Sequence, residues 1–248
     1  MSKQTDTAAL CAALVAAVDH AVDNNGTCLM AFHENAPPDI LHHSMDAGTA
    51  GHYLDRYLAG PYLLDPLYQL AIQTKKAVAC RFRDAIPDRF RSSEYYRQYY
   101  ERTHLRDELD FLLPAGADDK LVLVIGRFHK RFNKTELRRM KSIEAVVFST
   151  LAEIWKSWHG KSKEQQRDDR LHRRLTRCLA GFGAATLTRR ERQITQLLLQ
   201  GHSAKSVARE LRIAPGTVMV HKRNLFAKLN ITSQYELFSM FISELPNY

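Results

Sequence analysis

The chain has 248 residues, 45% of them hydrophobic, so it can bury either one large core or two smaller ones. No run approaches the roughly 18 apolar residues that a membrane-spanning helix needs. The four cysteines are scattered, with neither the paired spacing of a zinc site nor the density of a disulfide scaffold. These features predict a cytoplasmic protein with no membrane partner and no metal or other cofactor.

The net charge of +9 is concentrated in the last third of the chain. Acidic and basic side chains balance in residues 1–160, whereas residues 187–248 carry nine Lys or Arg against four Asp or Glu. Residues 161–186 add seven Lys or Arg against three acids. A neutral globular part followed by a basic part is typical of a nucleic-acid-binding appendage, and a solvated basic tail would have the same composition.

Residues 1–160 mix helical and strand patterns. In chain order they predict an Ala-rich N-terminal helix, strands at 27–33 and 40–44, helices at 49–59 and 66–75, a strand at 77–82 and a helix near 93–101. The segment "ELDFLLPAGADDKLVLVIGRF" then predicts two strands joined by a Gly-Ala-Asp-Asp turn. Its "LVLVI" run favours a central strand that is covered on both faces.

A long helix at 134–158 closes this part. We therefore expect an α+β protein that begins with an α/β/α sandwich around an antiparallel sheet, an architecture that often encloses a pocket.

The remaining residues begin with a polar, charged stretch. Residues 161–186 predict a basic linker that turns helical near Asp168. The following "LTRRERQITQLLLQG" places Thr188 three residues before Glu191, which is a capping box, and ends at Gly201, a suitable residue after a helix. The segment "SAKSVARELRI" then predicts a second short helix, followed by a turn at "APGTV".

A helix that starts at this turn has two distinct faces. Val218, Leu225 and Leu229 fall on one stripe at 100° per residue, which leaves a small, polar and basic face free. Such a face suits entry into a DNA major groove about 12 Å wide. From periodicity alone, an ordinary helical hairpin with a solvated charged face is the competing interpretation.

The stretch "LTRRERQITQLLLQGHSAKSVARELRIAPGTVMVHKRNLFAKLNITSQYELF" resembles the LuxR-type helix-turn-helix domain along its whole length. The resemblance implies a four-helix domain whose third helix reads DNA and whose fourth often helps dimerisation. It implies base contacts by Met219, Val220 and Arg223. Ala214 stands where the family usually has a capping Ser. The residues placed near the DNA backbone, or bracing the helix, are Lys205, Thr217, His221, Lys222 and Lys228.

The segments "YLDRYLAGPYLLDPLYQLA" and "SEYYRQYYERTHLRDELDFLLPAGADDKLVLVIGRF" resemble the autoinducer-binding domain of quorum-sensing LuxR-type regulators. The resemblance implies ligand binding by Tyr53, Tyr57, Asp65 and Phe82. Packing in the core would explain the two tyrosines equally well. Asp65 precedes a proline, so a role in capping a helix would explain it equally well too.

Several residues depart from the pattern of that domain. Tyr53 replaces a Trp, no second Trp lies near Phe82, and Glu108 replaces a Gly. These differences favour a ligand other than an acyl-homoserine lactone.

Other functional classes lack their motifs. The sequence has no series of acidic residues and Lys at strand ends as in a phospho-receiver, and no G-x-x-x-x-G-K phosphate loop. It also has no catalytic motif, so we expect no enzyme.

The hypothesis is a ligand-responsive transcription factor that binds a palindromic double-stranded DNA site as a homodimer, with RNA polymerase as a further candidate partner. Its domains would be a sensor at 1–160, a linker at 161–186 and a DNA-binding domain at 187–248. The alternative is a constitutive regulator whose N-terminal domain only dimerises or binds a protein partner.

Overall fold

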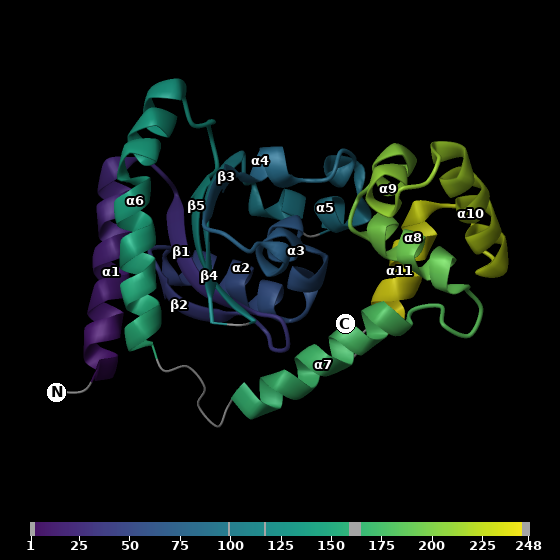
Figure 1. The fold of residues 1–248 in the computed structure, drawn as a ribbon, viewed down its shortest axis with the longest axis horizontal. Helices are drawn as coiled ribbons and strands as arrows, with labels where there is room; N and C mark the ends of the chain where they lie inside the picture. Colours follow the sequence, from purple (N-terminus) through teal and green to yellow (C-terminus); the bar gives the residue numbers. More distant parts are fainter. Residues whose placement is uncertain (1–2, 99, 117, 159–164, 245–248) are drawn as a thin grey trace.

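Five strands form one antiparallel sheet in the N-terminal part of the chain (Figure 1). The computed structural model describes residues 3–98, 100–116, 118–158 and 165–244. The strands lie in the order β2-β1-β5-β4-β3, with bounds β1 (Gly26–His33), β2 (Asp39–His43), β3 (Val78–Arg81), β4 (Asp107–Ala115) and β5 (Asp119–Arg127). The "LVLVI" strand is therefore central, with β1 on one side and β4 on the other.

Helices cover both faces of this sheet, which confirms the expected α/β/α sandwich (Figure 1). They are α1 (Lys3–Ala21), α2 (Ala47–Leu58), α3 (Pro66–Gln73), α4 (Phe82–Ala85), α5 (Glu94–Gln98) and α6 (Lys134–Ser157), with short 3-10 turns η1 (Pro61–Leu64), η2 (Phe90–Ser92) and η3 (Tyr100–Thr103). The helix expected near 93–101 is thus observed as α5 followed by η3. Helices α1 and α6 lie side by side on one face, and α2 to α5 lie on the other.

Helix α6 owes its position to a cap and an apolar stripe. Asn133 and Glu136 form a capping box at its start, and Arg127 at the end of β5 pairs with Glu136 at 2.9 Å. An apolar stripe along one face of this helix packs toward the sheet and α1, and it consists of Met140, Ile143, Val147, Leu151, Ile154 and Trp158. Burial against the sheet therefore accounts for the stripe without a second chain.

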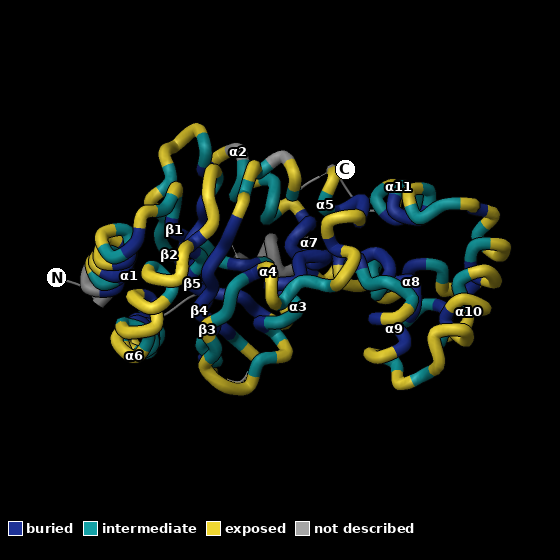
Figure 2. The backbone as a smooth tube through the Cα atoms, turned by 90° about the horizontal axis from the view of Figure 1, so that it is seen from above, coloured by how far each residue is buried: buried dark blue, intermediate teal, exposed yellow. Residues whose placement is uncertain are grey.

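The C-terminal part is helical: α7 (Gln165–Gly181), α8 (Arg189–Leu199), α9 (Ala204–Leu211), α10 (Pro215–Lys228) and α11 (Gln234–Glu244). Thr188 and Glu191 form the expected capping box of α8, and Gly201 follows that helix with a φ of 91°. Val218 and Leu225 are fully buried on the inner side of α10. Figure 2 shows that much of the rest of α10 is exposed.

Most of the predicted linker is helical. Helix α7 occupies 165–181, while residues 161–164 lie outside the described part of the chain. Leu175 is buried, and a side-chain carbon at Gly60 would come within 3.3 Å of it. One hydrophobic cluster accordingly runs from the α2–α5 side of the sheet into the C-terminal helices.

Within the described stretches, no helix is both long enough and apolar enough to cross a membrane.

Candidate functional site

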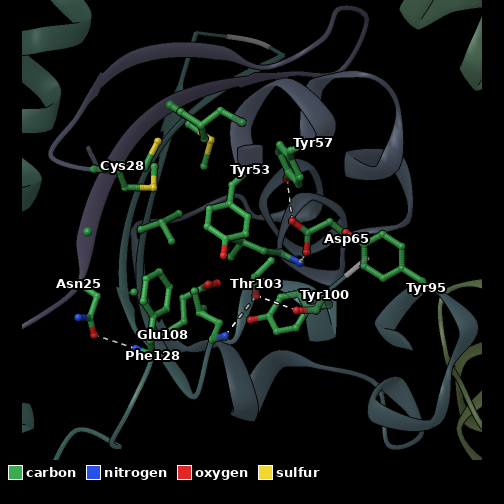
Figure 3. A pocket seen from close by; sticks show the side chains of 18 residues that line it. Asn25, Cys28, Tyr53, Tyr57, Asp65, Tyr95, Tyr100, Thr103, Glu108 and Phe128 are labelled. Carbon is green, nitrogen blue, oxygen red and sulfur yellow. Dashed lines mark hydrogen bonds between the residues drawn. The ribbon is translucent and has the colours of Figure 1, made fainter. Parts of the chain in front are cut away.

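A cavity of about 140 Å³ lies between the sheet and the helices α2 and α3 (Figure 3). Roughly 10–15 Å³ of such space holds one water, so this cavity is large enough for a small organic molecule. Its floor comes from side chains on one face of the strands, including Cys28, Met30, Glu108 and Val124. Cys28 and Met30 are two residues apart in β1, and they share this face because alternate residues of a strand point to the same side of the sheet.

Aromatic rings form much of the cavity wall. Tyr53 and Tyr57 come from α2, Tyr95 from α5 and Tyr100 from η3, and Phe128 directly follows β5. The rings of Tyr53 and Phe128 are 6.4 Å apart. The exposed wall is accordingly mostly apolar, and the few polar groups among the lining residues set the chemistry of the site.

Asp65 caps a helix and also lies at the cavity. Its Oδ1 accepts a hydrogen bond of 2.9 Å from the backbone N–H of Leu67, which caps α3, and its Oδ2 accepts one of 2.7 Å from the hydroxyl of Tyr57. Asp65 also lines the cavity (Figure 3). Burial raises the pKa of this carboxyl to about 6, although both hydrogen bonds lower it.

A second buried acid, Glu108, enters the cavity from β4. It is 7% exposed, and Asp110 lies two residues further along the same face of that strand with no exposed surface. Burial, followed by the charges of neighbouring acids, raises the pKa of both carboxyls. A side-chain hydrogen bond joins these two carboxyls, and Glu108 has a further one with Tyr100.

Three of the four residues expected to bind a ligand line the cavity, namely Tyr53, Tyr57 and Asp65. The fourth, Phe82, does not line it but stacks behind Tyr100, with ring centroids 5.0 Å apart and planes 6° apart. Sequence reasoning did not assign Tyr95, Tyr100 or Phe128 to the cavity wall.

The cavity wall continues into a contact with the C-terminal helices. Phe90, in η2, packs on Tyr95 and Tyr100 with ring centroids 6.0 and 5.3 Å apart. A side-chain carbon at Gly201, in the turn between α8 and α9, would lie only 2.9 Å from the Cα of Phe90. Only a glycine permits this approach, and its positive φ also favours glycine.

Hydrogen bonds fix the same contact. The backbone N–H of Arg89 donates to the carbonyl of Gly201 at 3.2 Å. Asp88 accepts a 3.0 Å bond from the backbone N–H of Ser203 and a second bond from its hydroxyl. Ser203 in turn caps α9, so Asp88 holds the start of that helix.

Helix α7 is anchored at a second point. The hydroxyl of Tyr62 and Nδ1 of His172 are 2.7 Å apart, and their rings stack with centroids 5.8 Å apart. Nε2 of His172 lies 3.1 Å from the carbonyl oxygen of Glu34. Nothing in the sequence pattern pointed to these contacts between distant segments.

The residues expected to face DNA lie mostly on the open side of α10. Met219 is 55% exposed and Val220 is 48% exposed, and Arg223 and Thr217 are also exposed. This face of α10 is therefore open to solvent.

The other expected DNA contacts have mixed surroundings. Lys205 is exposed at the start of α9, and His221 is half-buried. Lys222 lies over the ring of Phe226 at 5.2 Å, and its pKa is lowered by burial and then by the charge of Arg89. Lys228 forms a 2.8 Å ion pair with Glu191, so it braces α10 against α8.

Comparison with known proteins supports both parts of this description. Residues 185–241 match the family model "Bacterial regulatory proteins, luxR family". A protein of Aeromonas salmonicida, described as an HTH-type transcriptional regulator in the exeN 3′ region, is 33% identical over 157 residues, covering 61% of this chain and 80% of that protein. The transcriptional regulatory protein UhpA of Escherichia coli (strain K12) is 47% identical over 51 residues, which are 21% of this chain and 26% of UhpA.

Among solved structures, the LBD domain of VqsR from Pseudomonas aeruginosa superposes with a TM-score of 0.52 at 20% identity. The match covers 60% of this chain and 93% of that one. At this identity the likeness establishes a shared fold.

Proposed function

The chain belongs to the LuxR family of bacterial regulatory proteins and is a transcriptional regulator rather than an enzyme, and from this we propose that a small molecule in its cavity controls its binding to promoter DNA. Residues 1–160 would sense the molecule and residues 187–248 would bind DNA in the cytoplasm. Residues 161–186 would link these two domains.

The observation that carries this proposal is the continuity between the cavity and the contact with the helix-turn-helix. Tyr95 and Tyr100 line the cavity, Phe90 packs on both, and the backbone of Phe90 abuts Gly201. A molecule that repositions either tyrosine must therefore move Phe90 or strain it. Because packed interiors resist small displacements, such a change alters the free energy of the contact with Gly201.

A homodimer on a palindromic site is part of the same proposal. One reading helix neutralises few phosphates, so its affinity alone is modest and falls steeply with salt. Two helices on one dimer make the second contact intramolecular and raise the overall affinity. We expect half-sites about one helical turn apart, with α10 in the major groove. Footprinting that shows one unpaired half-site would contradict this arrangement.

Native mass spectrometry of the full-length protein, purified from the cells that make it, tests the sensor proposal. We expect a small organic molecule bound to each chain of a dimer. The variant Val124→Phe, which fills the cavity floor, should lose that molecule. Val146→Phe makes the same change at a site 63% exposed on α6, and it should keep the molecule.

A protein that carries no molecule, and that no small molecule stabilises, would instead favour the constitutive regulator.

A further inference from the structure

The charges that line the cavity all have one sign. Of its lining side chains, Asp65 and Glu108 are acidic, and none is a Lys, Arg or His. Both acids are more than nine-tenths buried. Burying a carboxylate without a positive partner is costly, so two such groups around one hollow need a specific explanation.

No base of the described residues supplies the missing charge. The ion pairs formed by the described side chains include Asp107 with Arg81, but none contains Asp65, Glu108 or Asp110. A separate crevice of about 20 Å³ touches the other side of Glu108, and three arginines line it: Arg83, Arg91 and Arg106. None of these arginines lines the ligand cavity.

The aromatic part of the cavity wall also suits a bound cation. Four tyrosine rings and one phenylalanine ring surround the same space as the two carboxylates (Figure 3). The faces of aromatic rings carry partial negative charge and attract ammonium groups within about 6 Å. Carboxylates that supply charge and rings that supply polarisable faces together form the usual environment of a bound amine.

We propose that the ligand of this cavity is a small organic cation, an amine with an apolar body, whose ammonium group lies between Glu108 and Asp65 and against the tyrosine rings. This inference rests on the proposed sensor function and adds the chemical class of the signal. Both acids already take part in hydrogen bonds, Asp65 with the N–H of Leu67 and the hydroxyl of Tyr57, and Glu108 with Tyr100 and Asp110. Glu108 is the specificity-determining residue, because the neighbouring Asp110 adds to the negative charge at its end of the cavity. An anionic ligand is disfavoured by both acids.

The electrostatics of the cavity agree with this assignment. The raised pKa values of Glu108 and Asp65 reflect the free-energy cost of ionising two buried acids that lack a positive partner. An ammonium group between them would remove that cost and favour the ionised carboxylates.

Three probes that share one ring and differ in charge test the proposal: 2-phenylethylamine, 2-phenylethanol and phenylacetate. Their dissociation constants are measured by calorimetry on the full-length protein near neutral pH. The amine should bind at least about tenfold more tightly than the alcohol, because a buried ion pair and cation–π contacts favour the cation. Phenylacetate should bind most weakly.

Two variants assign the preference to its residue. Glu108→Gln keeps the shape and removes the charge, so the amine and the alcohol should then bind within about threefold of each other. Glu94→Gln, which changes a similarly buried acid that pairs with Arg97 and does not line the cavity, should retain the preference for the amine. Thermal unfolding checks that each variant is folded. The order in which the wild-type protein binds the amine, the alcohol and phenylacetate tests the proposal without any variant.

An alcohol that binds wild-type protein as tightly as the amine overturns the inference, and so does an amine that fails to bind at millimolar concentration. If the protein still carries a molecule that Val124→Phe removes, only the charge assignment fails and the sensor proposal stands. If no molecule is carried and no probe binds, both fail.

Discussion

The contact between Asp88 and Ser203 should control how firmly the helix-turn-helix is held on the sensor. Asp88 accepts two hydrogen bonds from Ser203, one from its backbone N–H at 3.0 Å and one from its hydroxyl. Charge-assisted bonds contribute roughly 1.5–3 kcal/mol each when shielded from water. Asp88 is exposed, so we expect Asp88→Ala to weaken the contact by only about 1–2 kcal/mol in total, a factor of roughly 5–30.

Hydrogen exchange read residue by residue measures this loss. In Asp88→Ala, exchange of the amides of Ser203 and Arg89 should accelerate by that factor, because both are bonded across the contact. Amides in the middle of α8 and α10 should keep their rates. Asp84→Ala removes another exposed acid of the same segment, 3.6 Å from Arg83, and should change neither amide. Unchanged exchange at Arg89 in Asp88→Ala would refute the role given to this contact.

Three further predictions concern DNA reading and stability. Arg223→Ala should relax base preference by about 1–3 kcal/mol of discrimination, whereas Lys222→Ala should lower the affinity for all DNA sequences alike. If both variants lose the same affinity for random DNA, Arg223 does not read bases. Ala214→Ser should add about 1 kcal/mol to the free energy of unfolding, since α10 has an extended N-cap residue without a side-chain cap; an unchanged urea midpoint would contradict it. Burial opposes protonation of His33, but Asp39 and Asp119 outweigh it and raise its pKa above the ordinary 6.5. Its stabilising contribution is therefore complete below that value and lost as pH rises through the raised pKa; His33→Gln should abolish this alkaline decline in urea titrations, and an identical pH profile would count against the ion pairs.

The sequence predicted most of the fold because its local signals agree with one another. Thr188 and Glu191 form a capping box in both sequence and structure, and the all-apolar run in β5 lies at the centre of the sheet. The apolar stripe of α6 buries against the strands as its period requires. In each case the residues that determine the element lie within a few positions of one another.

The cavity could be predicted only in part. Tyr57 and Asp65 could be assigned because a family resemblance covers them, whereas the segment with Tyr95 and Tyr100 was predicted only as a helix. Their place at the cavity depends on how α5 and η3 pack against a distant strand, which no local pattern encodes. Strand alternation could have shown that Glu108 shares a face with the residues of the cavity floor.

The contact between Gly201 and Phe90 could not be predicted from the sequence. The glycine was correctly expected after α8, but its closeness to Phe90 depends on the packing of two parts more than 100 residues apart. Similarly, the residues predicted to form a linker include His172, whose ring stacks on Tyr62. A polar, charged composition predicts exposure and gives no information about a few anchoring side chains.

Control of DNA binding by the cavity is tested by comparing the affinity for DNA of protein with and without its cavity molecule. Fluorescence anisotropy would compare the full-length protein as purified with the same protein stripped of the molecule, on a duplex selected from a random pool. Coupling between two sites typically amounts to about 1–3 kcal/mol, so we expect dissociation constants that differ by about 5-fold to 150-fold. Equal dissociation constants for the two preparations would contradict control of DNA binding by the cavity.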